Sequence, residues 1–446
     1  MSKESQTEVV VQPNGADVNP FILNKRCTEH GRVLARHRRE VRFRAYGIAA
    51  LTTAGLFLAL LLVTIVSQGS SAFFQTKIQL DIHFDEAVID RKNSGDPDIW
   101  KKANYSKLIH TALKSRFPEA KSRSERKLLY GMISRGATGQ LRTALQEDKS
   151  LLGKTKSIWL YASSDIDMAE KGKITQDGDE TSRRVRDIQF SWIEELRQKG
   201  QIETGFNVLF LTAGDSREPE LAGIWGSVSG SLLTLFVCIL CAFPVGVGAA
   251  VYLEEFAAKN KWSDIIEVNL NNLAAVPSIV YGVLGLAVFL GAFNMPRSSA
   301  IVGGMTLALL VLPTIVITTR NSLKSVPPSI RDAAIGLGAS PIQVLLHHTL
   351  PLAMPGIMTG AILSIARALG ETAPLLMIGM VAFIADVPRS LSDPATALPV
   401  QVYLWADSPE LGFAEKTSAA IMVLLGFLII ANALAVYLRR KFEYKW

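Results

Sequence analysis

The sequence predicts an all-α polytopic membrane protein with six transmembrane helices and an inserted polar domain of the α/β or α+β class. Hydrophobic residues make up 49% of the 446 residues, and six runs are long enough to cross a bilayer. One long polar stretch separates the first run from the others. The mean hydropathy of +0.24 is low for a chain that is apolar throughout, so a membrane part and a polar part coexist.

The six apolar runs meet the length requirement of a membrane span, because a hydrocarbon core about 30 Å thick needs roughly 20 residues of helix. They lie at residues 46–67, 222–251, 266–292, 300–319, 353–384 and 417–438. The small residues of SQGSSA after the first run are typical of a signal-peptide cleavage site. Because some 45 residues precede that run, we expect an uncleaved anchor instead.

Basic residues flank the first and last runs. The segment HGRVLARHRREVRFR (30–44) precedes the first run, and RRKFEYK follows the last. Since Lys and Arg in short loops mark the cytoplasmic side, we expect both termini in the cytoplasm. The stretch 74–220 and the acidic loop 385–416 then face outward. The same bias accounts for the pI of about 9.2, and we expect no nucleic-acid partner.

The polar stretch 74–220 has the size of an independent domain. Its segment KIQLDIHF (77–84) alternates apolar and polar residues, which predicts a half-buried strand. Two more segments, SIWLYAS (157–163) and FNVLFLT (206–212), are strand-like. Three segments have helical spacing: YSKLIHTALKSRF, SERKLLYGMI and VRDIQFSWIEELRQK. We therefore expect a small α/β or α+β domain held close to the membrane.

Two patterns in this stretch fall short of a chemical site. Asp81, His83 and Asp85 alternate onto the solvent face of the predicted strand, so we expect a solvated face there and no metal site. The segment GKTKS at 153–157 resembles the end of a phosphate-binding loop, which requires a glycine five positions earlier. Asp148 occupies that position, so we expect neither nucleotide hydrolysis nor a cofactor.

Residues 320–356, between the fourth and fifth runs, are too long and too patterned for a simple connection. Pro327 and Pro328 can open a helix. Gly336 and Gly338 interrupt this helix, and we expect a second short helix that ends before Pro351. Small and apolar residues outside the bilayer are typical of a docking element. The alternative is a polar hairpin that only ties two spans together.

The stretch ARALGETAPLL (366–376) places Arg367 and Glu371 inside an otherwise apolar run. An ionised arginine at mid-bilayer costs about 2.5–3.5 kcal/mol. At a spacing of four the two side chains share one helix face and can neutralise each other. A guanidinium also binds tetrahedral oxyanions through parallel hydrogen bonds, and Thr372 adds a hydroxyl. The pair is therefore either structural or part of an anion pathway, and the flanking glycine and proline favour the second reading.

The cytoplasmic loop resembles a known signature. DAAIGLGASPIQVLLHHTLP is similar to the E-A-A-x3-G-x9-I-x-L-P segment of ABC importer permeases, a loop that docks onto the ATPase subunit. The matching positions are Asp332, Ala333, Ala334, Gly338, Leu350 and Pro351. Asp332 stands for the usual glutamate and His348 for the usual isoleucine.

Three other stretches narrow the resemblance. ARALGETAPLL is similar to the R-A-x-G-E-T-A-P segment of phosphate-specific permeases, and AAVPSIVYGVLGLAVF (274–289) to their V-P-S-I-x-Y-G-x-x-G segment. With LPTIVITTRNSLKSVP (312–327), they make residues 221–446 resemble the PstA-type membrane subunit of bacterial phosphate importers. The stretch 74–220 is absent from the compact pattern of that family.

The resemblance implies a multi-pass subunit of the bacterial inner membrane with the ABC importer permease fold. It would comprise a cytoplasmic basic tail (1–45), a first span (46–67), a periplasmic domain (74–220) and a core (221–446) with its docking loop (320–351). Its implied partners are a PstC-type permease, two ATPase subunits that hydrolyse ATP in its place, a periplasmic phosphate-binding protein and phosphate itself.

Within that frame we expect Arg367, Glu371, Thr372 and Arg320 in the anion pathway and the residues from Asp332 to Pro351 in coupling. Two alternatives stay open. One is an ABC permease for another oxyanion, such as molybdate or sulfate. The other is a membrane-anchored sensor whose outward domain binds a ligand.

Overall fold

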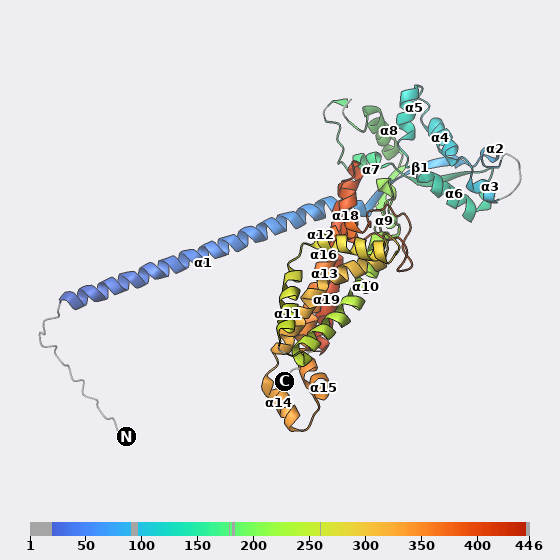
Figure 1. The fold of residues 1–446 in the computed structure, drawn as a ribbon. Helices are drawn as coiled ribbons and strands as arrows, with labels where there is room; N and C mark the ends of the chain where they lie inside the picture. Colours follow the sequence, from blue (N-terminus) through green and yellow to red (C-terminus); the bar gives the residue numbers. More distant parts are fainter. Residues whose placement is uncertain (1–19, 91–96, 178, 181–182, 259, 443–446) are drawn as a thin grey trace, which may run out of the picture. The chain divides into compact units, whose positions relative to one another are not determined.

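The computed structural model describes residues 20–90, 97–177, 179–180, 183–258 and 260–442 (Figure 1). The chain divides into two compact units between Thr64 and Ile65. The first unit holds most of one long helix. The second holds a small domain with a β-sheet and a helical core.

Helix α1 (Pro20–Gly69) is much longer than the predicted span 46–67. Its part from Arg39 onward, in the segment Arg39–Phe73, is long and apolar enough to cross a membrane. The first 25 residues of the sequence are polar and without periodicity, which predicts a disordered tail, and residues 1–19 of it lie outside the described residues. The prediction is wrong for residues 20–25, which are helical, because proline suits a first helical position and the residues after it include good helix formers.

The polar insertion contains a three-stranded antiparallel sheet in the order β2-β1-β3. Its strands are β1 (Phe74–His83), β2 (Thr155–Tyr161) and β3 (Ile202–Phe206). Its helices are α2 (Glu86–Ile89), α3 (Pro97–Lys101), α4 (Tyr105–Arg116), α5 (Arg123–Tyr130), α6 (Ala137–Glu147), α7 (Ser164–Glu170), α8 (Asp187–Gln198) and α9 (Val208–Thr212), with short turns η1 (Ser70–Phe73), η2 (Lys149–Leu151) and η4 (Pro219–Leu221). The central strand pairs Leu80 with Ile158 and Ile78 with Ile202.

The alternation in the first predicted strand is confirmed. Ile78, Leu80 and Ile82 are at most 3% exposed and belong to the core of the domain, together with Leu113 of α4 and Leu141 of α6. On the opposite face of β1, Asp81 and His83 are exposed, Lys77 and Gln79 are half-buried, and Gln75 is buried. The predicted strand at 157–163 and the three predicted helices are also present.

The predicted strand at 206–212 is wrong. Strand β3 ends at Phe206, and α9 follows. The Asn207 side chain caps this helix by accepting a hydrogen bond from the Phe210 backbone N–H at 3.0 Å, and its Nδ2 donates to the Ala72 carbonyl at 3.2 Å. A short apolar run is compatible with a buried helical turn as well as with a strand. Here the Asn207 cap favours the helix.

The helical core follows the domain in sequence. Its elements are α10 (Trp225–Val251), η5 (Tyr252–Phe256), α11 (Lys261–Ala274), α12 (Ser278–Gly285), η6 (Leu286–Ala292), α13 (Ala300–Lys324), α14 (Pro328–Gly336), α15 (Pro341–Val344), η7 (Leu345–Thr349), α16 (Leu350–Gly370), α17 (Ala373–Met377), α18 (Leu398–Ala406) and α19 (Leu411–Phe442). Within the described part of the chain, five helices are long and apolar enough to cross a membrane, or six if one bent pair counts as a span.

The predicted third span, 266–292, is not one straight helix. Helix α11 and the α12–η6 segment meet at an angle of 103°. Pro277 stands at the bend, where it lacks the N–H that a continuing helix needs. The Leu273 carbonyl accepts hydrogen bonds from the Tyr281 hydroxyl at 2.7 Å and from the Val276 backbone N–H at 3.1 Å, which ties the two arms of the bend together.

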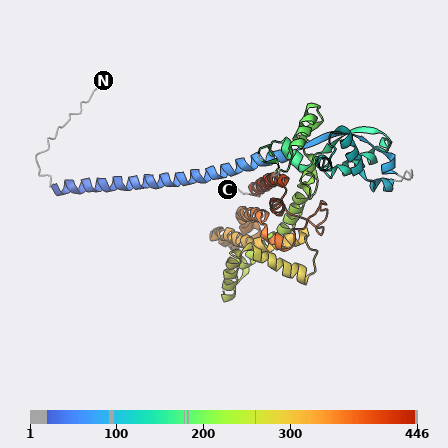
Figure 2. The same cartoon turned by 90° about the horizontal axis from the view of Figure 1, so that it is seen from above.

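Small residues bring the long helices of the core together. Figures 1 and 2 show α10, α13, α16 and α19 gathered in one bundle. A Cβ atom on Gly360 of α16 would lie 2.0 Å from the Thr318 hydroxyl oxygen of α13, and one on Gly356 would lie 2.3 Å from that of Ser322. This Gly-x-x-x-Gly spacing allows the close helix approach that is common in membrane proteins.

A buried charge cluster joins the domain to the core. Glu415 of α19, which is 4% exposed, accepts hydrogen bonds from Lys171 Nζ at 3.0 Å and Lys173 Nζ at 2.9 Å. Lys171 Nζ also lies 2.6 Å from the Asp167 carboxylate, which in turn accepts from the Thr76 backbone N–H of β1 at 2.8 Å. The sheet, α7 and α19 are thereby tied together.

The predicted acidic loop 385–416 is therefore only partly a loop. Helix α18 lies inside it, and α19 begins at Leu411. Glu415, one of the acids of the predicted loop, lies instead in α19 and is buried, because two lysines of the domain compensate its charge.

We predict that Glu415→Gln destabilises the junction by about 3 kcal/mol, since removing one partner of a buried ion pair leaves uncompensated charge. The measurement is the midpoint of thermal unfolding of the purified chain in detergent. Glu194→Gln is the matched control, because its ion pair with Arg197 is half exposed and is worth about 1 kcal/mol or less. Equal midpoints for the two variants would contradict the assignment.

Candidate functional site

The helix that carries Arg367 ends three residues later. Gly370 is its last residue, and Glu371 has an extended backbone with φ −83° and ψ 118°. Helix α17 begins at Ala373 with Pro374 in its first turn, where a missing N–H is tolerated. The apolar run 353–384 is thus not one straight span, because the backbone breaks between the flanking glycine and proline. Beyond α17 the chain is irregular, with Gly379 at φ +93°.

The predicted pairing of Arg367 with Glu371 is confirmed, although the two residues do not share one helix. Arg367 Nε lies 3.6 Å from Glu371 Oε1, and the side chains are 36% and 21% exposed. An ion pair this long and this exposed contributes about 1 kcal/mol at most. The last turn of a helix also favours a cation, so Arg367 does not depend on Glu371 alone.

The position of the pair along its helix differs from the prediction. Helix α16 has 21 residues, a length of about 30 Å at 1.5 Å per residue. Arg367 lies in its last turn and not at mid-span, because Gly370 ends the helix. Among the described residues, the structure gives the guanidinium no hydrogen-bond partner other than the distant Glu371 carboxylate, so donors are free for another anion.

The two sequence motifs of the core contact each other at this break. A Cβ atom on Gly282 of α12 would lie 2.7 Å from Pro374 Cα and 2.9 Å from Met377 Cβ of α17. Tyr281, beside it, lies within electrostatic range of Arg367. One site at two helix breaks is therefore built from two stretches about 90 residues apart in the sequence, V-P-S-I-V-Y-G and G-E-T-A-P.

The remaining predicted pathway residues take different places. Thr372 stands immediately before α17, and its side chain makes no capping hydrogen bond to that helix. Arg320 lies near the C-terminal end of α13, where its guanidinium lies 3.4 Å from the Glu254 carboxylate and 2.9 Å from that of Glu267. Thr372 thus adjoins the Arg367 pair, whereas Arg320 has its own partners. A role for either residue in anion passage stays a prediction.

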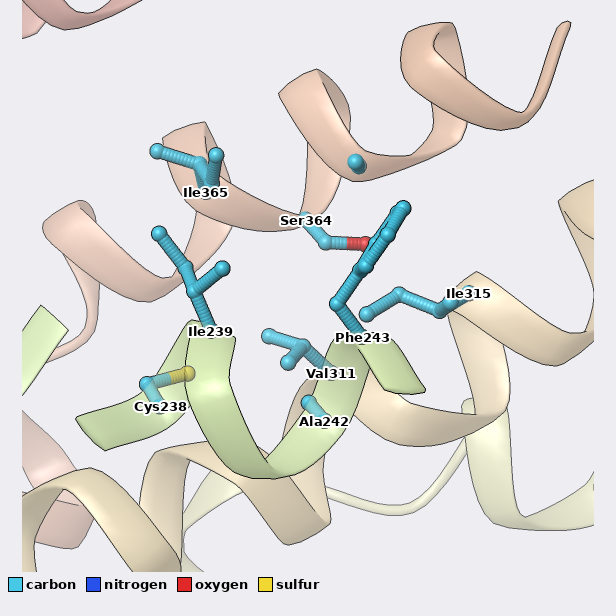
Figure 3. Close-up of a pocket in the computed structure, with 9 residues that line it drawn as sticks. Cys238, Ile239, Ala242, Phe243, Val311, Ile315, Ser364 and Ile365 are labelled. Carbon is cyan, nitrogen blue, oxygen red and sulfur yellow. The ribbon is translucent and has the colours of Figure 1, made fainter. Parts of the chain in front are cut away.

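The interior of the bundle beside Arg367 is closed. Between α10, α13 and α16 a cavity of about 20 Å³ remains (Figure 3). Apolar side chains such as Phe243 and Ile315 line it, and the Ser364 hydroxyl donates to the Gly360 carbonyl of its own helix at 2.9 Å. This volume suits about one water molecule. The cavity is therefore too small to hold an oxyanion between these three helices.

The helix–glycine–helix pattern of the loop is confirmed. Helix α14 begins after Pro327, Gly338 has φ +89°, and Ser340 caps α15 in a reciprocal capping box with Gln343. The predicted end before Pro351 is wrong, since helical structure continues from Pro341 to Gly370. The π-helical turn η7 precedes the proline and accommodates the hydrogen bond that Pro351 cannot donate.

The loop presents apolar side chains to its surroundings. Leu337 is 90% exposed, and Ile335, Ile342 and Leu346 are each more than half exposed. Of the signature positions, Asp332, Ala333 and Gly338 are exposed, Ala334 is buried, and Leu350 and Pro351 are half-buried. A cluster of exposed apolar side chains marks an interaction surface.

Sequence reasoning missed the acidic partners at the C-terminal end of α13. Glu254 and Glu255 follow directly after the apolar run of α10. Charged residues at the end of a span are usually solvated, so the pattern did not single them out. Their pairing depends on how α10, α11 and α13 pack.

Comparison with known proteins identifies the family. Residues 242–444 match the family described as binding-protein-dependent transport system inner membrane component. The phosphate transport system permease protein PstA of Haemophilus influenzae is 31% identical over 226 residues, which cover 51% of this chain and 78% of that protein. The chain belongs to the family of PstA-type transport permeases. This confirms the predicted permease subunit, in which ATP hydrolysis belongs to a separate subunit.

Other similarities extend this finding. PstA of Yersinia pestis is 32% identical over 213 residues, covering 48% of this chain and 71% of that protein. A domain of unknown function matches residues 31–180, which include most of the insertion. A solved structure of the inward-facing MetNI methionine ABC transporter is 17% identical, with a TM-score of 0.40 over 50% of this chain and 98% of that chain.

We predict that Gly282→Ala lowers the thermal unfolding midpoint of the purified chain, because the added methyl group meets the Pro374 backbone. Overpacking of this kind costs about 1–3 kcal/mol. Gly248→Ala is the control, since nothing lies within 4 Å of its added Cβ atom. An unchanged midpoint for Gly282→Ala would show that α12 and α17 are not in close contact.

Proposed function

We propose that this chain is the membrane-spanning permease subunit of an ATP-driven ABC importer that moves inorganic phosphate into the cytoplasm. The observation that carries the proposal is the partly exposed Arg367–Glu371 pair at the contact between two helix breaks. That site lies in the part of the chain that resembles the phosphate transport permeases.

The chemistry of the pair suits phosphate. Arg367 supplies a permanently charged donor fork for two oxygens of a tetrahedral anion. The Glu371 carboxylate keeps the empty site near neutrality and can accept a hydrogen bond from a protonated phosphate oxygen. Sulfate and molybdate dianions carry no such proton, so Glu371 would disfavour them. Thr372 adds a hydroxyl that can donate to a third oxygen.

The closed interior of the bundle supports a half-channel. Because the cavity between α10, α13 and α16 is too small for the anion, the path runs along an outer face that another subunit must complete. The proposed second half is a homologous PstC-type permease, and a periplasmic phosphate-binding protein delivers the substrate. Arg320 stays in the proposal as a residue at the inner end of the path.

The proposed topology follows the distribution of basic residues. Both termini, with the basic tail 1–45, would be cytoplasmic, and the domain formed by 74–220 would be an α+β periplasmic module. The core 221–446 would lie in the inner membrane with its docking loop 320–351 on the cytoplasmic side. The exposed apolar side chains of that loop would bind the ATPase subunits.

The docking loop and the anion site share one helical segment, which runs from Pro341 to Gly370. Closure of the ATPase subunits would move α15, and the continuous backbone would carry that movement to the turn that holds Arg367. Shifts of packed helices and domain closure are the usual means of switching access between two sides.

We predict that Arg367→Gln abolishes high-affinity phosphate uptake. Hydrogen bonds to charged groups contribute about 1.5–3 kcal/mol, so uptake at micromolar phosphate should fall by about tenfold or more. Labelled phosphate uptake is measured in cells that lack the native chain and carry either form at matched membrane levels. Arg389→Gln is the control, since Arg389 is exposed and lies outside the site.

Excess sulfate and molybdate separate the alternatives in the same assay. Uptake that both anions leave unchanged supports phosphate as the substrate, and strong competition supports a permease for another oxyanion. Normal uptake by Arg367→Gln would make the pair structural. If the unsubstituted chain restores no uptake, the phosphate proposal itself fails and the sensor alternative gains ground.

We predict that Leu337→Asp uncouples the subunit from its ATPase partners. A charge on the most exposed apolar side chain of the loop should weaken docking by about 1–3 kcal/mol, the usual cost of losing an interface residue. Co-purification of ATPase subunits with this chain is the measurement. Ile99→Asp, the same change at an exposed apolar residue of the polar domain, should leave it unchanged. Equal recovery from both variants would exclude the loop as the docking surface.

A further inference from the structure

We infer that Glu254 and Glu255 are positioning residues that link the docking loop to the inner end of the anion path and hold Arg320 in a closed arrangement. This inference rests on the proposed function and assigns a role to residues outside the family signatures. It concerns the ion pairs at the ends of α10, α11, α13 and α14.

Arg320 is held by two carboxylates from different elements. Its Nη2 lies 2.9 Å from Glu267 Oε2 of α11, and its Nε lies 3.4 Å from Glu254 Oε2 of η5. Lys324 Nζ lies 3.7 Å from the same Glu254 oxygen. The Arg320 side chain is only 13% exposed. The positive charges of Arg320 and Lys324 are thus neutralised by the carboxylates of Glu254 and Glu267. An arriving oxyanion would have to displace one of these carboxylates to bind Arg320.

The neighbouring acid, Glu255, binds the docking loop instead. Arg331 Nη2 of α14 lies 2.7 Å from Glu255 Oε1 and donates to the Leu323 carbonyl near the end of α13 at 3.0 Å. Arg331 directly precedes Asp332, the first position of the docking signature. A movement of α14 therefore acts first on this contact.

The π-helical turn η5 makes the link between the two sets of contacts. Consecutive residues of a helix point in different directions, so Glu254 reaches α13 while Glu255 reaches α14. Pulling on Glu255 displaces the same short turn that places the Glu254 carboxylate against Arg320. In the closed state Arg320 is masked. When α14 moves with the ATPase subunits, the turn shifts, Glu254 withdraws, and Arg320 becomes available to an anion that leaves toward the cytoplasm.

A purely structural role predicts a different behaviour. The Arg331 and Glu255 side chains are 26% and 16% exposed, so a structural role predicts that loss of their contact lowers the stability of the fold and nothing else. We expect this loss also to change how much phosphate is moved for each ATP hydrolysed, which stability alone does not affect.

The test uses the complete transporter in proteoliposomes, with this chain, its partner permease, the ATPase subunits and the phosphate-binding protein. Labelled phosphate uptake and ATP hydrolysis are measured together for Arg331→Glu, Glu255→Arg and the double charge swap. Each single variant should lower the ratio of phosphate moved to ATP hydrolysed by about tenfold, within the range of coupling between sites. The swap should restore it to within about threefold, and Arg331→Lys should retain most of it.

Matched controls and other outcomes complete the test. The pair Arg135–Glu218, at 3.1 Å in the polar domain, receives the same reversals and should leave the ratio unchanged. An unchanged ratio in Arg331→Glu overturns the inference, and so does a swap that fails to restore the ratio although the complex assembles. If the charge-reversal variants do not assemble into the transporter, Glu255→Gln is measured in their place. An unchanged ratio of phosphate moved to ATP hydrolysed in Glu255→Gln also overturns the inference. Failure of the unsubstituted transporter to move phosphate instead refutes the proposed function.

Discussion

A helix that breaks inside a membrane protein leaves backbone groups that lipid cannot satisfy, so protein must cover them. The site in this chain depends on how that constraint is met. At the α11–α12 bend the Leu273 carbonyl accepts from both the Tyr281 hydroxyl and the Val276 N–H, and the α16–α17 break packs against Gly282. The two breaks lie side by side, because Pro374 occupies the space that a side chain at position 282 would need. The charged residues are therefore presented where the backbone is already irregular.

This arrangement explains why the arginine is tolerated in an apolar segment. Arg367 lies in a helix end, with a favourable dipole and a carboxylate nearby, and keeps one third of its side chain exposed. It therefore does not carry the full cost of an isolated charge in hydrocarbon. The same features leave Arg367 only loosely engaged, which suits its proposed role of binding and releasing an anion.

The sequence predicts most of the spans, two of the three strands with the buried face of the first, the helix–glycine–helix loop and the approach of Arg367 to Glu371. These depend on periodicity, capping and local spacing, which a single segment carries. The helix breaks were predicted less well. Pro277 sits in the predicted third span and Gly370 in the fifth, yet prolines at 313 and 355 lie inside continuous helices. Whether a breaker ends a helix depends on what covers the freed groups.

Contacts between distant segments could not be predicted from the sequence at all. The approach of Gly282 to Pro374, the pairing of Arg320 with two glutamates, and the burial of Glu415 each join elements that no local pattern connects. Segment 206–212 shows the same limit at short range. Its apolar run allowed a strand, and the side chain of Asn207 turned it into a helix.

The junction at Glu415 has a consequence for how the chain is made. Lys173 precedes Glu415 by 242 residues, and domains generally form from the N-terminus during synthesis. The polar domain is thus complete in sequence long before its compensating carboxylate emerges on the last helix. Until then Lys171 has only Asp167 as its carboxylate partner, and Lys173 lacks the Glu415 carboxylate. Final closure of the junction must await insertion of α19, so the domain is locked in place only when the whole membrane core has been synthesised.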